Sequence, residues 1–353
     1  MNQFRLPNHL IIENGILNDI PSGIKDVFPD VKFPKTIIIT TEHLKGLFPD
    51  ILGQIQKSIP NSELRVIENA DYDSAVALAK YISMNDIKLV IGFGGGRVLD
   101  LVKFAAFVSK AKLVSLPTAL SNDSLASPVA VLGTEGKARK SFRCKIPDAI
   151  IVDVDIVKNT PKLQLLAGIG DTLSKYTAIY DWKLAARKNG EAMDDFACMM
   201  SHMAFESILF NTADDLTDRD FIRRLTNALV MGGLAMEVAG NSRPSSGSEH
   251  LFCHALEEDF SEQVSLLHGI ATAMGTYPAS IFQGQNPVKV AKIIKQYGIP
   301  AKPSDNGVTE DIFIQAWQGA AGTRADRYTI LNEADLSTSR LREVYAQMEE
   351  ELA

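Results

Sequence analysis

Three of the six histidines in this 353-residue chain fall within nineteen residues, at positions 250, 254 and 268. The segment before them contains a proline and a glycine, which predicts a break and then a new helix opening at Ser246 to Ser248. On that helix His250 and His254 stand four residues apart and share one face. His268 belongs to the next predicted helix. Neutral imidazoles converging from two helices suit a divalent metal ion, although core histidines also cluster by chance.

A site of two or three histidines still needs an anionic ligand, and Asp171 is the candidate. This residue follows Gly168 and Gly170 in an apolar segment with a helical pattern. A carboxylate without a partner is costly in such surroundings, and the structural alternative is a helix N-cap. Metal ligation explains Asp171 better, because His250 and His268 require an anionic companion.

A second candidate site is the glycine turn of residues 94–96, between a strand predicted over 88–92 and a helix predicted over 99–108. Missing side chains let a phosphate approach backbone N–H groups, and the positive end of the helix favours the anion. Arg97 stands where the last glycine of a GxGxxG pattern would be, so the ordinary dinucleotide-binding pattern is absent. A tight turn without a ligand is the alternative.

Asp100 and Lys103 stand one turn apart on that predicted helix, so an ion pair between them is one possible arrangement. The next loop, residues 117–128, carries four hydroxyl groups and the carboxylate of Asp123. Such a loop can be simply a polar turn. Because it leaves the carboxyl end of a strand beside the glycine turn, where open α/β sheets bind ligands, we favour ligand contact.

Strands and helices alternate through the first half of the chain. Apolar and β-branched runs predict strands over 10–12, 35–40, 64–67, 88–92, 112–117 and 149–153, with helices over 16–28, 42–58, 73–85 and 99–108. A small hairpin is predicted over 129–142. This alternation predicts an α/β N-terminal domain, residues 1–160, with a doubly wound, mostly parallel sheet.

The second half is helical in pattern. Apolar residues recur at intervals of three and four, which predicts helices over 163–187, 194–211, 218–239, 248–258, 264–282 and 288–296. We therefore expect an all-helical C-terminal domain, residues 161–353, which carries the candidate metal ligands.

Composition restricts the possible partners. The length predicts two domains, and the net charge of -7 argues against nucleic acid or an anionic membrane. No apolar run reaches transmembrane length, and the amino terminus lacks the apolar core of a signal peptide. Three widely spaced cysteines imply no disulfide framework. We expect a cytoplasmic protein that binds neither nucleic acid nor membrane.

These motifs together resemble the superfamily of iron-containing alcohol dehydrogenases, glycerol dehydrogenases and dehydroquinate synthases. The glycine turn with Asp100, the Pro-Thr loop, Gly170-Asp171 and the two later histidines keep that order over nearly the whole chain. Within the superfamily the chain is most similar to the sn-glycerol-1-phosphate dehydrogenases. The similar segments are 121–128, 167–175, 181–182, 242–254 and 327–331.

The resemblance implies one divalent ion, of the zinc type with nickel or iron as alternatives, held by Asp171, His250 and His268. It implies a catalytic group of these three residues and His254, with substrate contacts from Asp123, Asp171 and His254. NAD or NADP would bind at positions that are similar in the family: Gly94, Gly95, Gly96, Arg97, Val98, Asp100, Thr118, Ser121 and Ser127. Residues 40–42 do not decide between the two nucleotides.

The implied activity is the metal-dependent, NAD(P)H-linked reduction of dihydroxyacetone phosphate to sn-glycerol 1-phosphate. Three protein ligands leave one coordination position open, as a catalytic metal requires. His254, one turn from His250, could bind the substrate or relay the proton. The alternatives are a glycerol dehydrogenase or another polyol or alcohol dehydrogenase, a dehydroquinate synthase-like lyase, and a non-catalytic metal-binding protein.

The expected partner is a small triose phosphate or polyol, and we expect the chain to form a homo-oligomer, a dimer or larger. A phosphorylated substrate needs cationic groups near the metal. Arg243, seven residues before His250, is the first candidate, with Arg324 and Arg327 behind it. Any of these arginines could instead form an ordinary ion pair.

Overall fold

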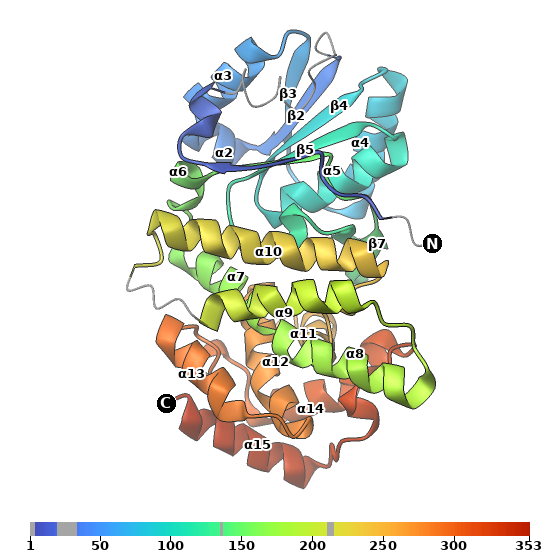
Figure 1. Ribbon diagram of the computed structural model, residues 1–353, viewed down its shortest axis with the longest axis vertical. Helices are drawn as coiled ribbons and strands as arrows, with labels where there is room; N and C mark the ends of the chain where they lie inside the picture. Colours follow the sequence, from blue (N-terminus) through green and yellow to red (C-terminus); the bar gives the residue numbers. More distant parts are fainter. Residues whose placement is uncertain (1–3, 20–33, 135–136, 210–214) are drawn as a thin grey trace. The chain divides into compact units, whose positions relative to one another are not determined.

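The computed structural model describes residues 4–19, 34–134, 137–209 and 215–353 (Figure 1). The chain divides into two compact units. Unit 1 comprises Met1–Pro161 and Leu216–Thr226, and unit 2 comprises Lys162–Asp215 and Asn227–Ala353. The sequence had indicated a single boundary near residue 160, with residues 216–226 in the second domain.

Residues 216–226 belong to unit 1 because of contacts made by the start of α10 (Arg219–Ala239). The Arg219 guanidinium lies 2.8 Å from the carboxylate of Asp155. Arg223 donates to the carbonyl of Ile12, next to the first strand. Ile222 is fully buried. These partners lie 64 or more positions away in sequence, so helical periodicity alone does not reveal them.

Unit 1 is built on one parallel sheet. Its strands, in chain order, are β1 (His9–Glu13), β2 (Thr36–Thr41), β3 (Ser62–Ile67), β4 (Leu89–Gly94), β5 (Lys112–Pro117) and β8 (Ala149–Asp153). They lie in the order β1-β8-β5-β4-β2-β3, and every neighbouring pair is parallel. The predicted doubly wound α/β fold is confirmed.

Alternating side chains of the strands face two apolar layers, as the pleat of a strand requires. Ile37 and Ile39 of β2 pack with α4 (Tyr72–Met84) and α5 (Gly96–Ser109). Ile38 packs with α3 (Pro49–Ser58) on the other layer. All three isoleucines are fully buried. Helices therefore cover both faces of the sheet.

Several predicted elements have different bounds. The helix predicted over 42–58 is two helices, α2 (Glu42–Leu47) and α3, because Pro49 starts a new helix at its first position. The predicted hairpin consists of β6 (Val129–Thr134) and β7 (Lys137–Arg143), whose turn residues lie outside the described chain. Of the helix predicted over 16–28, the described part is the short 3-10 helix η1 (Ile16–Asp19). The remaining short helices are η2 (Asp123–Leu125) and α6 (Val154–Val157).

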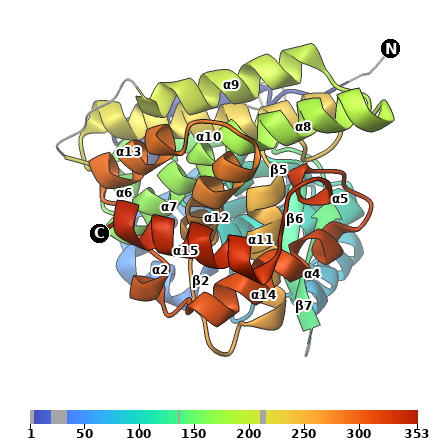
Figure 2. The ribbon, with the colours of Figure 1, turned by 90° about the horizontal axis from the view of Figure 1, so that it is seen from below.

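Unit 2 contains helices and no strand among its described residues (Figure 2). Besides the later part of α10, its α-helices are α7 (Lys162–Leu173), α8 (Lys175–Asn189), α9 (Asp195–Leu209), α11 (Ser248–Asp259), α12 (His268–Phe282), α13 (Pro287–Tyr297), α14 (Glu310–Ala320) and α15 (Thr338–Glu351). The predicted helical domain is confirmed as a fold. The helix predicted over 163–187 is interrupted at Ser174, and no bounds were predicted for α14 and α15.

An aromatic cluster fixes α11 against α14. Phe252 of α11 stacks on Trp317 of α14 with ring centroids 4.7 Å apart, and Phe313 meets Phe252 edge-on at 5.7 Å. Trp317 and Phe252 are fully buried. Aromatic rings of this size dominate the packing of a helical core. The cluster therefore holds the helix that carries His250 and His254 in a fixed position.

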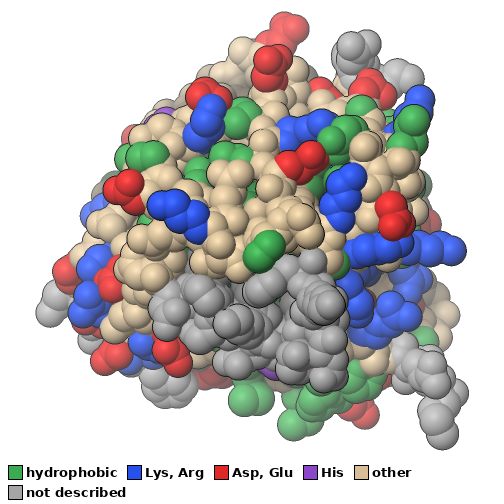
Figure 3. Space-filling model, turned by 90° about the horizontal axis from the view of Figure 1, so that it is seen from above, with side chains coloured by type: hydrophobic (Ala, Val, Ile, Leu, Met, Phe, Trp, Pro, Cys, Tyr) green, Lys and Arg blue, Asp and Glu red, His purple; other side chains and the backbone are tan. Residues whose placement is uncertain are grey.

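Three further features concern the whole chain. The three cysteines are buried and form no disulfide, as predicted. Among the described residues, no helix has the length and apolar character needed to cross a membrane. Acidic and basic side chains are intermingled on the face of the molecule shown in Figure 3.

Candidate active site

Two glycines bring the helices of Asp171 and His268 together. A Cβ atom on Gly170 of α7 would lie 2.1 Å from the carbonyl oxygen of Gly269, and one on Gly269 of α12 would lie 1.8 Å from that of Ala167. Such distances leave no room for a side chain. The backbones of α7 and α12 therefore touch next to Asp171 and His268, which is the physical role of the Gly170-Asp171 and His268-Gly269 pairs.

His250 is placed by the start of α11, whose N-terminus is held differently from the prediction. The cap position is Gly247, which has no side chain to cap the helix, rather than a serine. Asp181 of α8 caps this helix instead, because its Oδ2 accepts a 2.7 Å hydrogen bond from the Ser248 N–H. Its Oδ1 accepts from the Ile330 N–H at 2.8 Å. Asp181 is fully buried and joins α8, α11 and the segment before Leu331.

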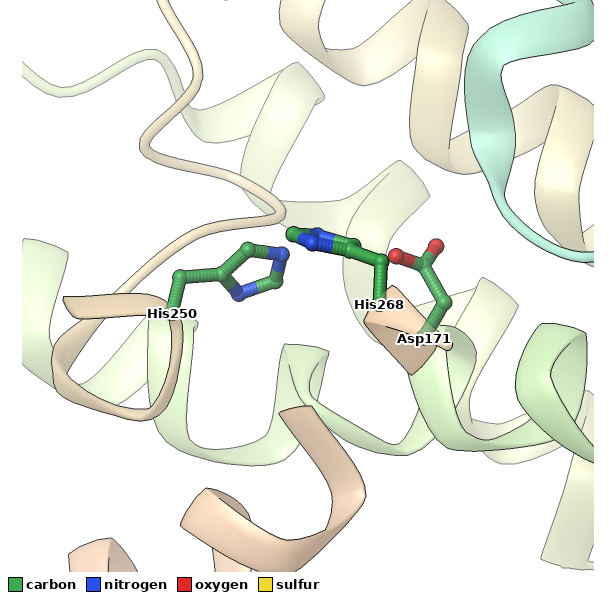
Figure 4. Close-up of side chains that lie close together, drawn as sticks. All are labelled: Asp171, His250 and His268. Atoms are coloured by element: carbon green, nitrogen blue, oxygen red, sulfur yellow. The ribbon is translucent and has the colours of Figure 1, made fainter. Parts of the chain in front are cut away.

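The structure brings Asp171, His250 and His268 together. One potential ligand atom of each residue lies within 4.8 Å of those of the other two. Figure 4 shows the carboxylate and the two rings pointing toward one another from α7, α11 and α12. Asp171 and His250 are buried, and His268 keeps 23% of its side chain exposed. One carboxylate and two imidazoles form a donor set that fits a divalent ion.

Each histidine of this group is oriented by a glutamate that the sequence analysis did not identify. The Nδ1 of His250 lies 2.8 Å from Oε1 of Glu249, which is itself fixed by the Gly247 N–H and the Thr177 hydroxyl. The Nδ1 of His268 lies 3.2 Å from Oε1 of Glu257. With Nδ1 engaged in this way, Nε2 is the nitrogen that each ring offers to an ion.

Lys175 is a third residue beside the group whose role was not predicted. Its side chain is fully buried, and Nζ lies 3.4 Å from Oδ2 of Asp171 and 3.1 Å from the Asp171 carbonyl oxygen. The sequence does contain a signal for this contact. Asp171 and Lys175 are four residues apart, a spacing that places two side chains on one helical face. The Lys175 ammonium thus contacts the Asp171 carboxylate from within α8, beside the two rings.

His254 lies beside the same group. Its ring centroid is 6.3 Å from that of His250 and 6.0 Å from that of His268. Its Nδ1 is 3.6 Å from Oε2 of Glu257, so that one carboxylate lies next to both His254 and His268. The side chain of His254 is 14% exposed. A titratable ring with limited solvent access is suited to proton transfer.

Burial and neighbouring charges shift the pKa values of two pairs of groups in opposite directions. One pair is Glu249 and His250, and the other is Glu257 and His268. Burial, helped by the charge of His268, lowers the pKa of His250 well below its ordinary value. Burial raises the pKa of Glu249 to about 7, against the hydrogen bonds from Thr177 and Gly247. In the second pair the carboxyl pKa is lowered and the imidazole pKa is raised. Burial would raise the pKa of Glu257, but hydrogen bonds from His254 and His268 bring it below its usual range.

Burial also opposes the charged form of His268, yet Cys253 and Glu257 raise the pKa of its ring well above the ordinary value. The pKa of His254 is lowered, mainly by burial. The arrangement therefore favours a neutral His250 and a neutral His254 beside an ion pair of Glu257 and His268. A divalent ion held by Nε2 of His268 would take the place of that proton.

Arg243, the first candidate for binding a substrate phosphate, is instead bound to other groups of the protein. Arg243 is 3% exposed, and its guanidinium forms an ion pair with Glu191 and donates to the Tyr328 carbonyl at 2.7 Å. Arg327 donates to the Ser246 carbonyl at 2.9 Å and to the Ser242 hydroxyl at 2.7 Å. Both arginines hold the loop that precedes α11. The sequence could not show this, because their partners lie 52 to 85 positions away.

Arg324 has a different position. It ends the short helix η4 (Ala321–Arg324), which packs beside α11, and donates to the Thr323 carbonyl at 3.1 Å. Burial and the charge of His268 lower the pKa of His254, and the positive charge of Arg324 adds to this effect, against the hydrogen bond and the charge of Glu257. Of the three arginines considered for a phosphate, Arg324 is the one whose charge acts on His254.

The glycine turn of unit 1 has the geometry of an anion site. Gly95 is the cap residue of α5 and has no side chain to cap the first N–H groups of the helix. The start of a helix presents such groups, with a partial positive charge, to an anion. A Cβ on Gly94 would lie 2.6 Å from Val98, whereas one on Gly95 would meet only Ala119, at 3.7 Å. The fold therefore needs a glycine at 94 but leaves space at 95.

The polar loop lies beside this turn, because β4 and β5 pair with Gly94 opposite Pro117. The Thr118 N–H donates to the Gly94 carbonyl at 3.0 Å, and Thr118 is buried. Asp123 begins η2 and is half-buried, as is Ser121. The hydroxyl of Ser127 accepts from Lys103 at 3.1 Å.

Asp100 and Lys103 form the ion pair that their spacing on the predicted helix allowed. The Lys103 Nζ lies 2.9 Å from Oδ1 of Asp100, and both side chains are buried. Oδ2 of Asp100 accepts from the Val131 N–H at 3.1 Å. The two residues thus fasten α5 to β6, while Arg97 is exposed at the start of the helix.

Known proteins resemble the chain along nearly its whole length. It is 35% identical to the glycerol-1-phosphate dehydrogenase [NAD(P)+] of Sulfurisphaera tokodaii over 324 residues, which cover 90% of this chain and 91% of the relative. It is 32% identical to the enzyme of that name from Methanococcoides burtonii, covering 93% and 90% of the two chains. Residues 12–161 match the family model described as iron-containing alcohol dehydrogenase.

Solved structures share the fold. The glycerol dehydrogenase of Schizosaccharomyces pombe matches with a TM-score of 0.80 at 16% identity, covering all of this chain and 91% of that one. A probable glycerol dehydrogenase from Sinorhizobium meliloti matches with a TM-score of 0.77 at 18% identity, covering 99% and 98% of the chains. The chain thus belongs to the family of NAD(P)+-dependent glycerol-1-phosphate dehydrogenases, within the iron-containing alcohol dehydrogenases.

Proposed function

We propose that this protein catalyses the reversible, metal-dependent reduction of dihydroxyacetone phosphate by NAD(P)H to sn-glycerol 1-phosphate. A hydride and a proton are added to the ketone, and NAD(P)+ is released. The observation that carries the proposal is that Asp171, His250 and His268 converge in a chain of this family. These residues lie on three helices and span nearly a hundred positions, so their convergence is a property of the fold.

Asp171, His250 and His268 would hold one divalent ion, which we propose is Zn²⁺, with Ni²⁺ and Fe²⁺ as alternatives for the same donors. The residues around them fit this role, because Glu249 and Glu257 orient the two rings and the Lys175 ammonium contacts the Asp171 carboxylate. When bound, the ion supplies Lewis-acid polarisation of the ketone, and the nicotinamide supplies the hydride.

His254 is the proposed proton donor to the substrate oxygen. It stands one turn from His250 and next to Glu257. As an imidazolium, protonated from solvent, the ring would give its proton to the substrate oxygen and become neutral, the form that its lowered pKa favours. In the reverse direction the same ring would accept the proton of the alcohol. We propose that Asp171 also contacts the substrate, and that Asp123 of unit 1 does so.

The nicotinamide nucleotide is proposed to bind along unit 1. Its pyrophosphate would be held by the N–H groups of residues 95–98 at the start of α5. Thr118, Ser121 and Ser127 would supply hydroxyl contacts from the neighbouring loop. Asp100 would act indirectly, since its carboxylate is engaged by Lys103 and Val131.

The substrate phosphate is proposed to bind Arg324. Its charge acts on His254, whereas Arg243 and Arg327 hold the loop before α11. A guanidinium is well suited to phosphate, because its N–H groups can donate two parallel hydrogen bonds.

We further propose that the protein works in the cytoplasm as a homo-oligomer. Support comes from α9, where Phe196, Met199 and Met203 recur at three and four residues and are all more than half exposed. Light scattering in solution would give the number of chains.

The deciding experiment is a substrate panel with the enzyme reconstituted with zinc, nickel or iron. Oxidation of NADH and of NADPH is followed with dihydroxyacetone phosphate, dihydroxyacetone and simple aldehydes. We expect the phosphorylated ketone to have the highest kcat/KM. In the reverse direction, sn-glycerol 1-phosphate should be oxidised and sn-glycerol 3-phosphate should not. A preference for free dihydroxyacetone would instead make the protein a glycerol dehydrogenase.

A further inference from the structure

We propose that Cys253, Glu257 and His268 form a second metal site, which takes a thiophilic divalent ion such as Zn²⁺ or Cd²⁺ and inhibits the enzyme. Cys253 and Glu257 stand four residues apart on α11, and His268 begins α12. One potential ligand atom of each lies within 4.8 Å of the others. The binding of the ion follows from this geometry alone, while the inhibition rests on the function proposed above.

The distances within the cluster match those around a tetrahedral ion. The Cys253 sulfur is 3.3 Å from Nδ1 of His268 and 3.7 Å from Oε1 of Glu257, and that oxygen is 3.2 Å from Nδ1. Sulfur, nitrogen and oxygen ligands at ordinary zinc bond lengths are separated by about 3.3 to 3.6 Å in a tetrahedron. The three atoms therefore need only small shifts to bind one ion, with the fourth position left to water.

The chemistry and the access of the site favour a soft ion. A thiolate selects zinc or cadmium over magnesium or calcium. Cys253 is fully buried, but Glu257 and His268 keep 22% and 23% of their side chains exposed, so an ion can enter from that side. Binding would release the thiol proton of Cys253 and the Nδ1 proton of His268. Without the ion, the same atoms form a hydrogen-bonded network.

The second site competes with the first for His268. For the ion held with Asp171 and His250, the ring offers Nε2 and keeps its proton on Nδ1, next to Glu257. For an ion at the second site, the ring must offer Nδ1. A neutral imidazole has only one nitrogen lone pair to give. Occupation of the second site would therefore remove His268 from the first and leave the catalytic ion with two protein ligands.

Cadmium titration of the zinc-loaded enzyme tests the proposal, with the ultraviolet thiolate-to-cadmium charge-transfer band and the dehydrogenase activity as separate readouts. In the wild type we expect the band to saturate near one equivalent, and activity to fall at least tenfold in parallel. Cys253→Ser should show neither effect, each activity being compared with that of the same variant without cadmium. Cys198→Ser, which alters a buried cysteine of α9 outside this cluster, should behave like the wild type.

An unchanged band in Cys253→Ser, or no band in the wild type, would rule out the site. A band without loss of activity would rule out the competition for His268. If Cys253→Ser does not fold, Cys253→Ala gives the same comparison. Because the band does not depend on turnover, failure of the proposed activity on every substrate would leave the test of the metal site intact.

Discussion

At the scale of single residues, the site depends on side chains that touch the proposed ligands from outside. Glu249 contacts His250 and is itself held by Thr177 and Gly247, all within one buried network. Glu257 contacts both His254 and His268. A ligand ring that can rotate binds an ion more weakly than one whose second nitrogen is fixed. The affinity for the metal should therefore depend on these glutamates as well as on the ligands.

Glu249→Gln should lower the affinity for zinc by about 10- to 100-fold, because an amide orients the His250 ring less strongly than a carboxylate. The glutamine can still accept from Gly247, so the start of α11 should be kept. The measurement is a competition titration with a chromogenic chelator at pH 8, above the pKa of about 7 of this carboxyl. Glu258→Gln, exposed on the same helix, is the control. Equal affinities in the two variants would remove Glu249 from the site.

Arg324→Ala should raise the KM for dihydroxyacetone phosphate by about ten- to a hundredfold, the effect of losing a charge-assisted hydrogen bond worth about 1.5–3 kcal/mol. The KM for dihydroxyacetone should not change, since that ketone carries no phosphate. Steady-state kinetics on both ketones separates the two cases. Arg340→Ala, which removes an exposed ion pair on α15, is the control. Equal losses on both ketones would assign Arg324 to the fold.

At the scale of elements, two features of the backbone position the site. The first is the contact between α7 and α12 at Gly170 and Gly269, which places Asp171 beside His268. The second is the start of α5, where the cap residue Gly95 has no side chain to accept from the first N–H groups. Both features depend on the missing side chain of glycine. At Gly170 and Gly269 it allows two helices to pack closely, and at Gly95 it leaves room for a ligand.

Gly269→Ala should both destabilise the protein and weaken metal binding. The added methyl would lie 1.8 Å from the Ala167 carbonyl oxygen, so the two helices must separate. Overpacking of this kind costs about 1–3 kcal/mol. Urea denaturation and zinc affinity measure the two effects. Gly53→Ala, in α3 with no atom within 4 Å of the added methyl, should be neutral or stabilising. Wild-type metal affinity in Gly269→Ala would contradict this account of the crossing.

Gly95→Val should weaken the binding of NAD(P)H at least tenfold without loss of stability or metal. The backbone at Gly95 is extended, and a Cβ there meets only Ala119, so the fold accepts a side chain. A bulky group would stand where the phosphate has to approach the N–H groups. Fluorescence titration and thermal denaturation check both parts. Gly94→Ala, whose methyl would lie 2.6 Å from Val98, should instead lower the stability. Unchanged NADH affinity in Gly95→Val would exclude this placement.

At the scale of the whole molecule, the two units carry different parts of the proposed reaction. Unit 1 contains the parallel sheet and the glycine turn, while unit 2 contains the proposed ligands and His254. The stability of unit 2 rests partly on buried polar groups, among which Asp181 joins α8 to the start of α11. Buried carboxyls of this kind make the stability depend on pH.

Burial and the nearby charge of Glu249 raise the pKa of Asp181 from 3.8 to about 6. The folded protein therefore holds this proton more tightly than the unfolded chain. Its contribution to stability is fully present below about pH 4 and is lost as the pH rises through 6. Asp181→Asn should flatten the fall in unfolding free energy between pH 4 and 6, measured by urea denaturation. Asp311→Asn, exposed on α14, should keep the wild-type slope. Parallel curves for both variants would contradict the raised pKa.

The sequence by itself determined the class of fold and the types of the proposed ligands. Alternating apolar runs are a local property, so they located the strands of the sheet and most helices of unit 2. Asp171, His250 and His268 could be predicted as ligands, since their residue types and helical context already limit their chemistry. The interruption at Ser174 was not predicted, and α12 begins four residues later than predicted, because helix ends depend on contacts as well as on periodicity.

Only the tertiary structure decided which side chains meet. Arg243 is paired with Glu191 and Tyr328 instead of being available to a phosphate, and residues 216–226 belong to unit 1. The sequence did not distinguish three charged helical residues, Glu249, Glu257 and Lys175, from others of their type. The packing of the helices in unit 2 places them against the proposed ligands. The physical reason is that sequence periodicity assigns a residue to one face of its own helix, whereas the group opposite that face comes from a distant part of the chain.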